Sequence, residues 1–138
     1  MILHAFTDGA SRGNPGESGI GIILRSPEGS VLLEEHGYIG RTTNNMAEYT
    51  ALLTLLERME KFPCTHLVIH SDSELLVRQM RGQYKVKSEG LKELHRKALK
   101  SIASLPCSVE LVHVPREQNR DADRLANQGV DSGVQARR

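Results

Sequence analysis

Four acidic residues lie where an apolar run meets a turn or on the apolar stripe of an expected helix: Asp8, Glu48, Asp72 and Asp123. Folding could bring the four carboxylates to one place. Several anions held at close range cannot all stay ionised unless a cation compensates their charge. Hard oxygen ligands favour Mg²⁺ or Mn²⁺ over zinc, and Mg²⁺ often completes its shell with phosphate oxygens. The set therefore suggests two-metal hydrolysis of a phosphodiester.

The strands that would carry two of these residues can be read from apolar runs. Residues 2–7 have the composition of an interior strand and end at Asp8. Strands over residues 19–25 and 30–39 follow across short turns, which predicts an antiparallel meander. Residues 67–69 are typical of a strand covered on both faces, and that strand leads to Asp72. If the first and fourth strands pair in parallel, Asp8 and Asp72 lie together at their carboxyl ends.

The third carboxylate belongs to an expected helix over residues 45–61. Glu48 precedes Leu52 by four residues and Leu55 by seven, so it shares the apolar stripe of that helix. Burying an unpaired carboxylate there is costly, and a metal ion would remove the cost.

The remaining elements follow from helical spacing and from turn residues. We expect a helix over residues 73–81, a second one that Ser88 can cap and Pro106 stops, a strand over 109–113 and a helix over 121–130. The polar residues 131–138 predict a flexible C-terminal tail. The order of elements predicts an α/β fold.

Length and composition bound the architecture. The chain has 138 residues, of which 38% are hydrophobic, and this fits a single domain over residues 1–130. No apolar run is long enough to span a membrane, and the start lacks the pattern of a signal peptide, so we expect a cytoplasmic protein. Cys64 and Cys107 show no metal-ligand spacing and are expected to be buried thiols, although a disulfide is possible if their strands are neighbours.

Positive charge is concentrated in one part of the chain. The net charge is +1, but residues 78–100 contain eight Lys or Arg against only Glu89 and Glu93. A solvated helix face would explain this segment by itself. Beside a carboxylate metal site, a track for nucleic-acid phosphates is the better interpretation.

The acidic positions and the residues around them resemble those of type 1 ribonuclease H. The resemblance covers nearly the whole chain and is carried by four segments in the family's order, which are residues 6–16, 42–48, 71–75 and 113–126. It implies a ribonuclease H-like five-stranded mixed sheet, made of an antiparallel meander of three strands plus two parallel strands and flanked by helices. It also implies endonucleolytic hydrolysis of the RNA strand of RNA/DNA hybrids, giving 5′-phosphate and 3′-hydroxyl ends.

The resemblance assigns roles to individual residues. Asp8, Glu48, Asp72 and Asp123 match the carboxylates that hold two Mg²⁺ ions, for which Mn²⁺ is a possible substitute, and His113 matches a histidine that assists proton transfer or product release. Arg116 is an alternative for the latter role. The implied substrate-binding residues are Gly9, Ala10, Asn14, Arg41, Thr43, Asn44, Asn45, Glu74 and Ser88.

One departure from many members is an absence. The chain contains no tryptophan and lacks the basic, tryptophan-rich insertion, so it is a compact form of the family. Lys85 and Lys87 must then bind the hybrid without that insertion, and we expect binding to be weaker and more salt-sensitive than in members that have it.

Other functions fit parts of the pattern. A binding-only module on the same fold and a metal-dependent nuclease for other duplexes are the alternatives. A phosphatase with a carboxylate nucleophile fits less well, because no second aspartate stands two residues after Asp8. We expect an RNA/DNA hybrid as partner, a monomer, no obligate protein partner and no membrane association.

Overall fold

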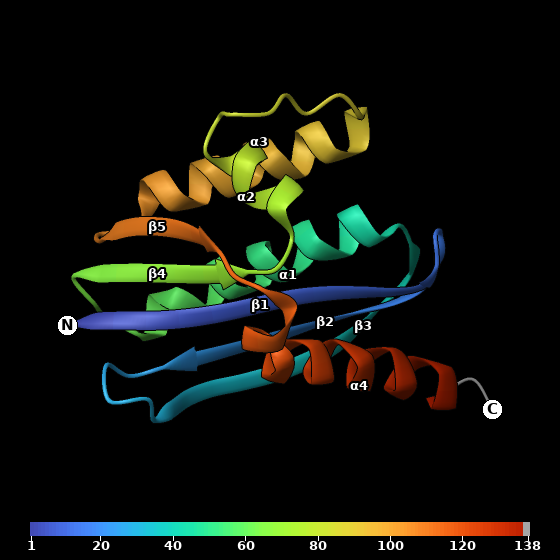
Figure 1. The fold of residues 1–138 in the computed structure, drawn as a ribbon, viewed down its shortest axis with the longest axis horizontal. Helices are drawn as coiled ribbons and strands as arrows, with labels where there is room; N and C mark the ends of the chain where they lie inside the picture. Colours follow the sequence, from blue (N-terminus) through green and yellow to red (C-terminus); the bar gives the residue numbers. More distant parts are fainter. Residues whose placement is uncertain (137–138) are drawn as a thin grey trace.

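A single mixed sheet organises the chain in a computed structural model, which describes residues 1–136. Five strands lie in the order β3-β2-β1-β4-β5 (Figure 1). The strands are β1 Ile2–Gly13, β2 Gly16–Arg25, β3 Val31–Thr42, β4 His66–Ser71 and β5 Ser108–His113. The helices are α1 Asn44–Arg58, α2 Glu74–Met80, α3 Glu89–Ser104 and α4 Arg120–Ala136, with short 3₁₀ turns at Met59–Lys61 and Arg116–Gln118.

Strand pairing confirms the expected topology. β1 pairs antiparallel with β2, and β2 with β3, whereas β1–β4 and β4–β5 are parallel. The first two strands are longer than their apolar runs, because their pairing continues through polar residues to Gly13 and Gly16. The resulting hairpin extends past Asp8 beside the start of α1.

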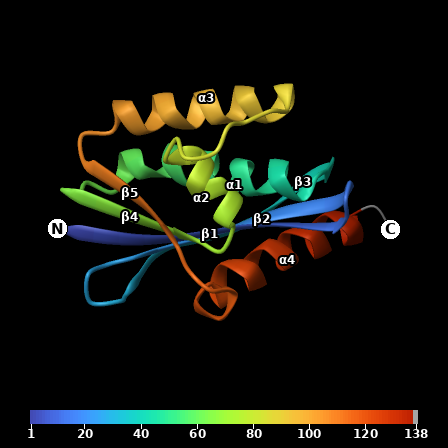
Figure 2. The same cartoon turned by 45° about the horizontal axis from the view of Figure 1, so that its top comes forward.

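Two layers of helices cover the sheet. Figure 2 shows α1 and α3 on one side and α4 on the other. The core between α1 and the sheet contains Leu52, Leu55, Ile22 and Ile69, each fully buried. Their alternation along the strands and their helical spacing in α1 place the apolar faces against each other.

α4 approaches the sheet closely because small residues meet at the contact. A methyl group on Gly21 would lie 2.3 Å from the carbonyl oxygen of Ala122, and one on Gly19 would lie 2.4 Å from that of Ala126. Only glycine allows a helix backbone to pack so near to β2.

The C-terminal tail expected over residues 131–138 is wrong for residues 131–136, which continue α4. Gly133 is buried, and a methyl group on it would overlap the ring of Tyr38 on β3. Packing against β3 therefore extends the helix beyond the point suggested by local polarity. Residues 137 and 138, the end of the expected tail, lie outside the described residues.

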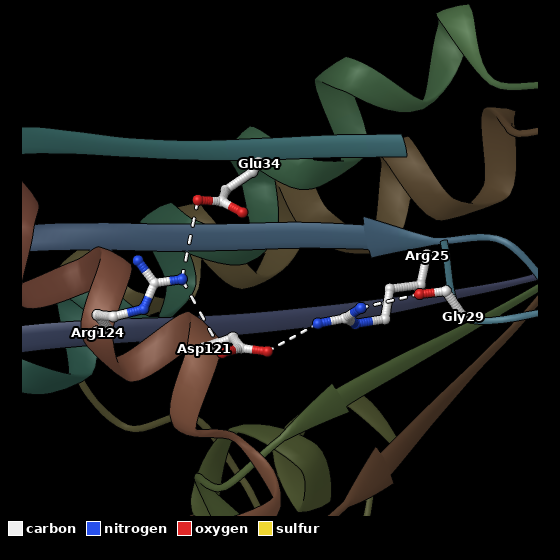
Figure 3. A network of polar contacts seen from close by, with 5 residues as sticks. All are labelled: Arg25, Gly29, Glu34, Asp121 and Arg124. Atoms are coloured by element: carbon white, nitrogen blue, oxygen red, sulfur yellow. Dashed lines mark hydrogen bonds and ion pairs between the residues drawn. The ribbon is translucent and has the colours of Figure 1, made fainter. Parts of the chain in front are cut away.

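Ion pairs fix the first turn of α4 on the sheet (Figure 3). Arg25 of β2 donates to Asp121 at 2.7 Å and to the carbonyl oxygen of Gly29 at 2.9 Å. Arg124 lies 3.8 Å from Glu34 of β3 and 3.9 Å from Asp121. These pairs are partly exposed and individually weak, but together they orient the turn that carries Asp123.

The two cysteines are free and partly buried. They stand just before β4 and β5, which are neighbours, and both line a cavity of about 520 Å³. Burial, followed by contact with Cys107, raises the pKa of Cys64 to about 11. Among the described residues, no helix has both the length and the apolar character needed to cross a membrane.

Candidate metal centre

Neighbouring parallel strands bring Asp8 and Asp72 together. Phe6 of β1 is paired with His70 of β4. Asp8 stands two residues after Phe6, and Asp72 stands two residues after His70. Ser73 caps α2 by accepting a hydrogen bond from the Leu76 amide at 3.2 Å, so the chain turns away directly after Asp72. The two carboxylates thus lie together just beyond the parallel pairing of β1 with β4, as the sequence predicts, although β1 itself continues to Gly13 instead of ending at Asp8.

Glu48 reaches the same place from α1. Its Oε1 accepts a short hydrogen bond from the backbone amide of Gly9. Oxygen atoms of Asp8, Glu48 and Asp72 all lie within 4.8 Å of one another. Asp8 is 6% exposed and Glu48 4%, so these two charges are largely removed from water, whereas Asp72 is half-buried.

Gly9 makes this approach possible. A methyl group there would lie 2.3 Å from the carbonyl carbon of Ala47 and 2.4 Å from the amide nitrogen of Glu48. A side chain at this position would push β1 away from α1 and separate the two carboxylates.

Asp123 faces the same cavity from α4. The cavity measures about 430 Å³ and is bordered by all four predicted carboxylates. Asp123 is not one of the three residues whose carboxylate oxygens lie within 4.8 Å of one another, so it stands at the periphery of the cluster. Asn127, one helical turn later, donates to the Asp123 carbonyl at 3.0 Å and to its carboxylate at 3.5 Å.

The electrostatics of the cluster oppose ionisation. Burial, and then the charge of Glu48, raises the pKa of Asp8 to about 10. Burial also raises the pKa of Glu48 to about 7, although the Gly9 amide acts in the opposite direction. The pKa of Asp72 is raised by burial and by Asp123, against the effect of Arg116.

A cation would reverse these shifts, because it favours the charged form of each carboxylate. The ligands on offer are carboxylate oxygens, which suit a hard divalent ion such as Mg²⁺ or Mn²⁺. Glu48 sits on a buried helix face, where its carboxylate accepts from the neutral amide of Gly9. The residues present therefore fit a divalent metal centre.

Most of the predicted substrate residues lie at or beside one of two cavities. Gly9, Ala10 and Asn44 border the carboxylate cavity. Asn14 accepts a hydrogen bond from the Asn44 amide at 3.1 Å, which docks the β1–β2 hairpin on the start of α1. This connection places both asparagines at one edge of the cavity.

A second cavity, of about 620 Å³, lies beside the start of α1 and includes Asn45 and Ser88. We call it the lysine groove, because two lysines line it. Its other lining residues are Leu75, Gln79, Gln83, Tyr84, Lys85, Lys87 and Leu91. Ser88 stands at the N-cap of α3, as the sequence predicts, but its side chain makes no capping hydrogen bond. Its hydroxyl is exposed at the groove.

The other predicted contacts are at the surface. Thr43 caps α1 by accepting from the Met46 amide at 3.2 Å. Arg41 is exposed at the end of β3. Glu74 is exposed and paired with Arg78 at 3.1 Å. None of these three borders the carboxylate cavity within the described part of the chain.

His113 and Arg116 differ in their relation to the metal centre. His113 ends β5, pairs with Ser71 and is exposed, without bordering the carboxylate cavity as the structure describes it. Arg116 does border it. Three residues that sequence reasoning did not assign also line it, namely Ser11, Ser73 and Asn127. The position of Asn127, four residues after Asp123, was the signal that could have identified it.

Comparison with known proteins agrees with this geometry. The model of the family described as reverse transcriptase-like matches residues 6–129. A ribonuclease HI of Halobacterium salinarum is 37% identical over 94% of this chain, which spans 64% of that relative. A bifunctional protein of Mycobacterium tuberculosis is 42% identical over 99% of this chain, which spans 37% of it. The chain thus covers less than two thirds of the length of these relatives.

A solved structure resembles the chain over nearly its full length. The crystal structure of LC11-RNase H1 in complex with RNA/DNA hybrid has a TM-score of 0.91 and 41% sequence identity, covering 96% of this chain and 99% of that one. The sheet and its helices are therefore arranged as in a protein that holds a hybrid.

Proposed function

The chain belongs to the reverse transcriptase-like family, in the branch of the ribonucleases H, and on this basis we propose that it is an endoribonuclease that hydrolyses the RNA strand of RNA/DNA hybrids. The observation that carries the proposal is the carboxylate cluster. Three acidic side chains from β1, α1 and the end of β4 lie within 4.8 Å of one another, and two of them are buried. Such a cluster has little use in a module that only binds nucleic acid.

The proposed metal ligands are Asp8, Glu48, Asp72 and Asp123. Two Mg²⁺ ions, or Mn²⁺ in their place, would supply an activated water and stabilise the leaving 3′ oxygen of the scissile phosphate. Two of these carboxylates have hydrogen-bond donors beside them, the Gly9 amide at Glu48 and the Asn127 side chain 3.5 Å from Asp123. The expected products have 5′-phosphate and 3′-hydroxyl ends.

Recognition of the RNA strand is assigned to the edge of the carboxylate cavity. The backbone of Gly9 and Ala10 and the side chains of Asn14 and Asn44 lie there and can contact 2′-hydroxyl groups. Asn45, which borders the lysine groove, and Glu74, exposed at the start of α2, are assigned to minor-groove contacts.

The DNA strand is assigned to the surface around the start of α1 and the lysine groove. Arg41, Thr43 and Ser88 are the proposed phosphate contacts, and Ser88 opens onto the lysine groove. A hydroxyl donates one hydrogen bond to a phosphate oxygen without adding charge, so the neighbouring lysines must provide the electrostatic attraction.

Arg116 is the better placed of the two candidates for product release, because it borders the carboxylate cavity and His113 does not. An arginine there can attract the cleaved phosphate away from the metal ligands. His113 keeps a proposed role in proton transfer only if the loop after β5 rearranges when substrate binds.

We further propose a monomeric, cytoplasmic protein without an obligate partner. Its single ribonuclease H domain, expected over residues 1–130, is lengthened by the rest of α4.

Cleavage of an end-labelled RNA/DNA hybrid tests the function, beside DNA duplex, RNA duplex and single-stranded RNA. We expect cleavage of the hybrid in Mg²⁺, none in chelator and none by Asp8→Asn. An Asp131→Asn variant, whose carboxylate pairs with Arg12 away from the cluster, serves as the charge-matched control and should remain active. Folded wild-type protein that binds the hybrid but cleaves it with neither metal would leave the binding-only module as the function.

A further inference from the structure

The basic segment between α2 and α3 has little regular structure of its own. In Figure 1, the chain between these helices runs as an extended loop. Lys85 and Lys87 are exposed on it and border the lysine groove. A loop of this kind is usually mobile, and mobile lysines lose conformational entropy when they bind phosphates.

The first half of the loop is held by the end of α2. The amides of Gln83 and Tyr84 donate to the carbonyl oxygen of Arg78 at 2.8 and 3.2 Å. Gly82, with φ +77, turns the chain back over the helix. The Arg78 guanidinium lies 5.3 Å from the centre of the Tyr84 ring. These contacts reach Tyr84 and stop before the lysines.

The second half is held by a single buried side chain. Gln79 is 4% exposed, in the last turn of α2. Its Nε2 donates to the carbonyl oxygen of Lys85 at 3.3 Å, and its Oε1 accepts from the Tyr49 hydroxyl at 2.7 Å. Its backbone carbonyl lies 3.1 Å from Nε2 of His95 on α3. One amide thus connects α1, α2 and the basic loop.

No other polar contact fixes the loop backbone there. Within residues 1–136, no further hydrogen bond involves the backbone of residues 85–87, and the next one is the α3 bond from Lys92 to Ser88. Val86 packs against the core and adds an apolar anchor. An apolar anchor alone permits sliding, whereas a directional bond to the Lys85 carbonyl sets how the two neighbouring lysines project.

We propose that Gln79 is a positioning residue that holds the Lys85–Lys87 segment at the edge of the lysine groove, where it meets the phosphates of the bound nucleic acid. This rests on the proposed function. Gln79 touches neither the carboxylate cavity nor any predicted metal ligand. It acts on binding, because it fixes a basic surface before the nucleic acid arrives.

The decisive variant is Gln79→Met, which keeps the length and volume of the side chain but removes both hydrogen bonds. The matched control is Tyr49→Phe, which removes the hydroxyl at the other end of the same amide and leaves the contact with Lys85. Gln79→Asn is a milder second variant, because its amide is one methylene too short to reach both partners. Circular dichroism melting shows the temperature range in which each variant is folded.

Binding is measured by fluorescence anisotropy with an RNA/DNA hybrid in chelator, over a range of salt concentrations, and cleavage is measured separately in Mg²⁺. We expect Gln79→Met and Gln79→Asn to raise KM, leave kcat near wild type and reduce the slope of log affinity against log salt by about 1 to 2. Tyr49→Phe should lower the melting temperature without this change in slope.

A double-mutant cycle adds the Lys85→Ala and Lys87→Ala changes to Gln79→Met. The combined variant should lose less binding free energy than the sum of the losses in the separate variants, because Gln79 acts through the lysines. Additive losses, or an equal slope in Gln79→Met and wild type, would overturn the inference. Wild-type protein that fails to bind or cleave the hybrid would instead overturn the proposed function.

Discussion

Asn119 donates a hydrogen bond from Nδ2 to the carbonyl oxygen of Thr7 at 2.9 Å, across 112 positions of the sequence. Thr7 immediately precedes Asp8, and the carbonyl of Asn119 accepts from the Asp123 amide at 3.0 Å. The strand that carries one carboxylate is thereby connected to the helical turn that carries another. Asn119 is 1% exposed, so the connection is protected from water.

Replacing Asn119 with alanine should therefore impair both stability and catalysis. We expect the free energy of unfolding to fall by about 1–3 kcal/mol, since the buried Thr7 carbonyl loses a partner. We expect kcat to fall by roughly tenfold to a hundredfold as Asp123 shifts relative to Asp8. Thermal melting and hybrid cleavage measure the two effects. Gln118→Ala, at an exposed neighbouring position, is the control, and a lower melting temperature with unchanged kcat would refute the link to catalysis.

The carboxylate cluster predicts how stability depends on pH in the absence of metal. The folded-state pKa values of Glu48 and Asp8 are raised to about 7 and about 10, so the folded protein holds protons that the unfolded chain has released. Their stabilising effect is fully present below the unfolded pKa values, near 4, and is lost as the pH rises through the folded ones. We expect metal-free protein to be substantially less stable at pH 8 than at pH 5.

Melting curves in chelator at pH 5, 7 and 8 measure this trend. Mg²⁺ should restore stability at pH 8, because it takes the place of the protons, and should have little effect at pH 5. Asp8→Asn should flatten the metal-free profile, since it removes the buried carboxyl whose pKa is raised most. A metal-free protein that is more stable at pH 8 than at pH 5 would contradict the proposed electrostatics.

The close approach of β1 to α1 predicts that Gly9→Ala is damaging. The added methyl group would meet the Ala47 and Glu48 backbones at 2.3 and 2.4 Å, so one element must move. We expect a loss of about 1–3 kcal/mol in stability and of about tenfold or more in cleavage. Gly37→Ala is the matched control, because its nearest neighbour would lie at 3.6 Å. Equal activity in the two variants would show that the approach is not needed.

The distribution of ion pairs predicts which lysines contact nucleic acid. Arg78, Lys92 and Arg96 are paired with nearby glutamates, whereas Lys85 and Lys87 border the lysine groove. Lys87→Ala should weaken hybrid binding and lower its salt slope by about 1. Lys100→Ala is the control, because Lys100 borders the cavity beside Cys64 and Cys107. Binding titrations at several salt concentrations distinguish the two, and equal slopes would argue against a phosphate track at the groove.

Local sequence predicted the order of the elements and the convergence of three carboxylates. Apolar runs ending at Asp8 and Asp72, and the position of Glu48 on a helix stripe, predicted the edge of the sheet at which the carboxylates meet, because strand alternation and helix periodicity are local properties. The order of elements, with the resemblance of four segments, predicted the mixed sheet that the structure shows. The chemistry of the cluster followed from residue types.

Tertiary contacts decided the rest. α4 extends to Ala136 because Gly133 packs on Tyr38, a contact 95 positions apart that local polarity does not reveal. Asn119 and Gln79 are ordinary polar residues in the sequence. Their roles in connecting separate elements follow only from their burial and from hydrogen bonds to distant residues. Periodicity determines which face of an element is apolar, but the identity of the atoms that meet across two elements depends on how the whole chain packs.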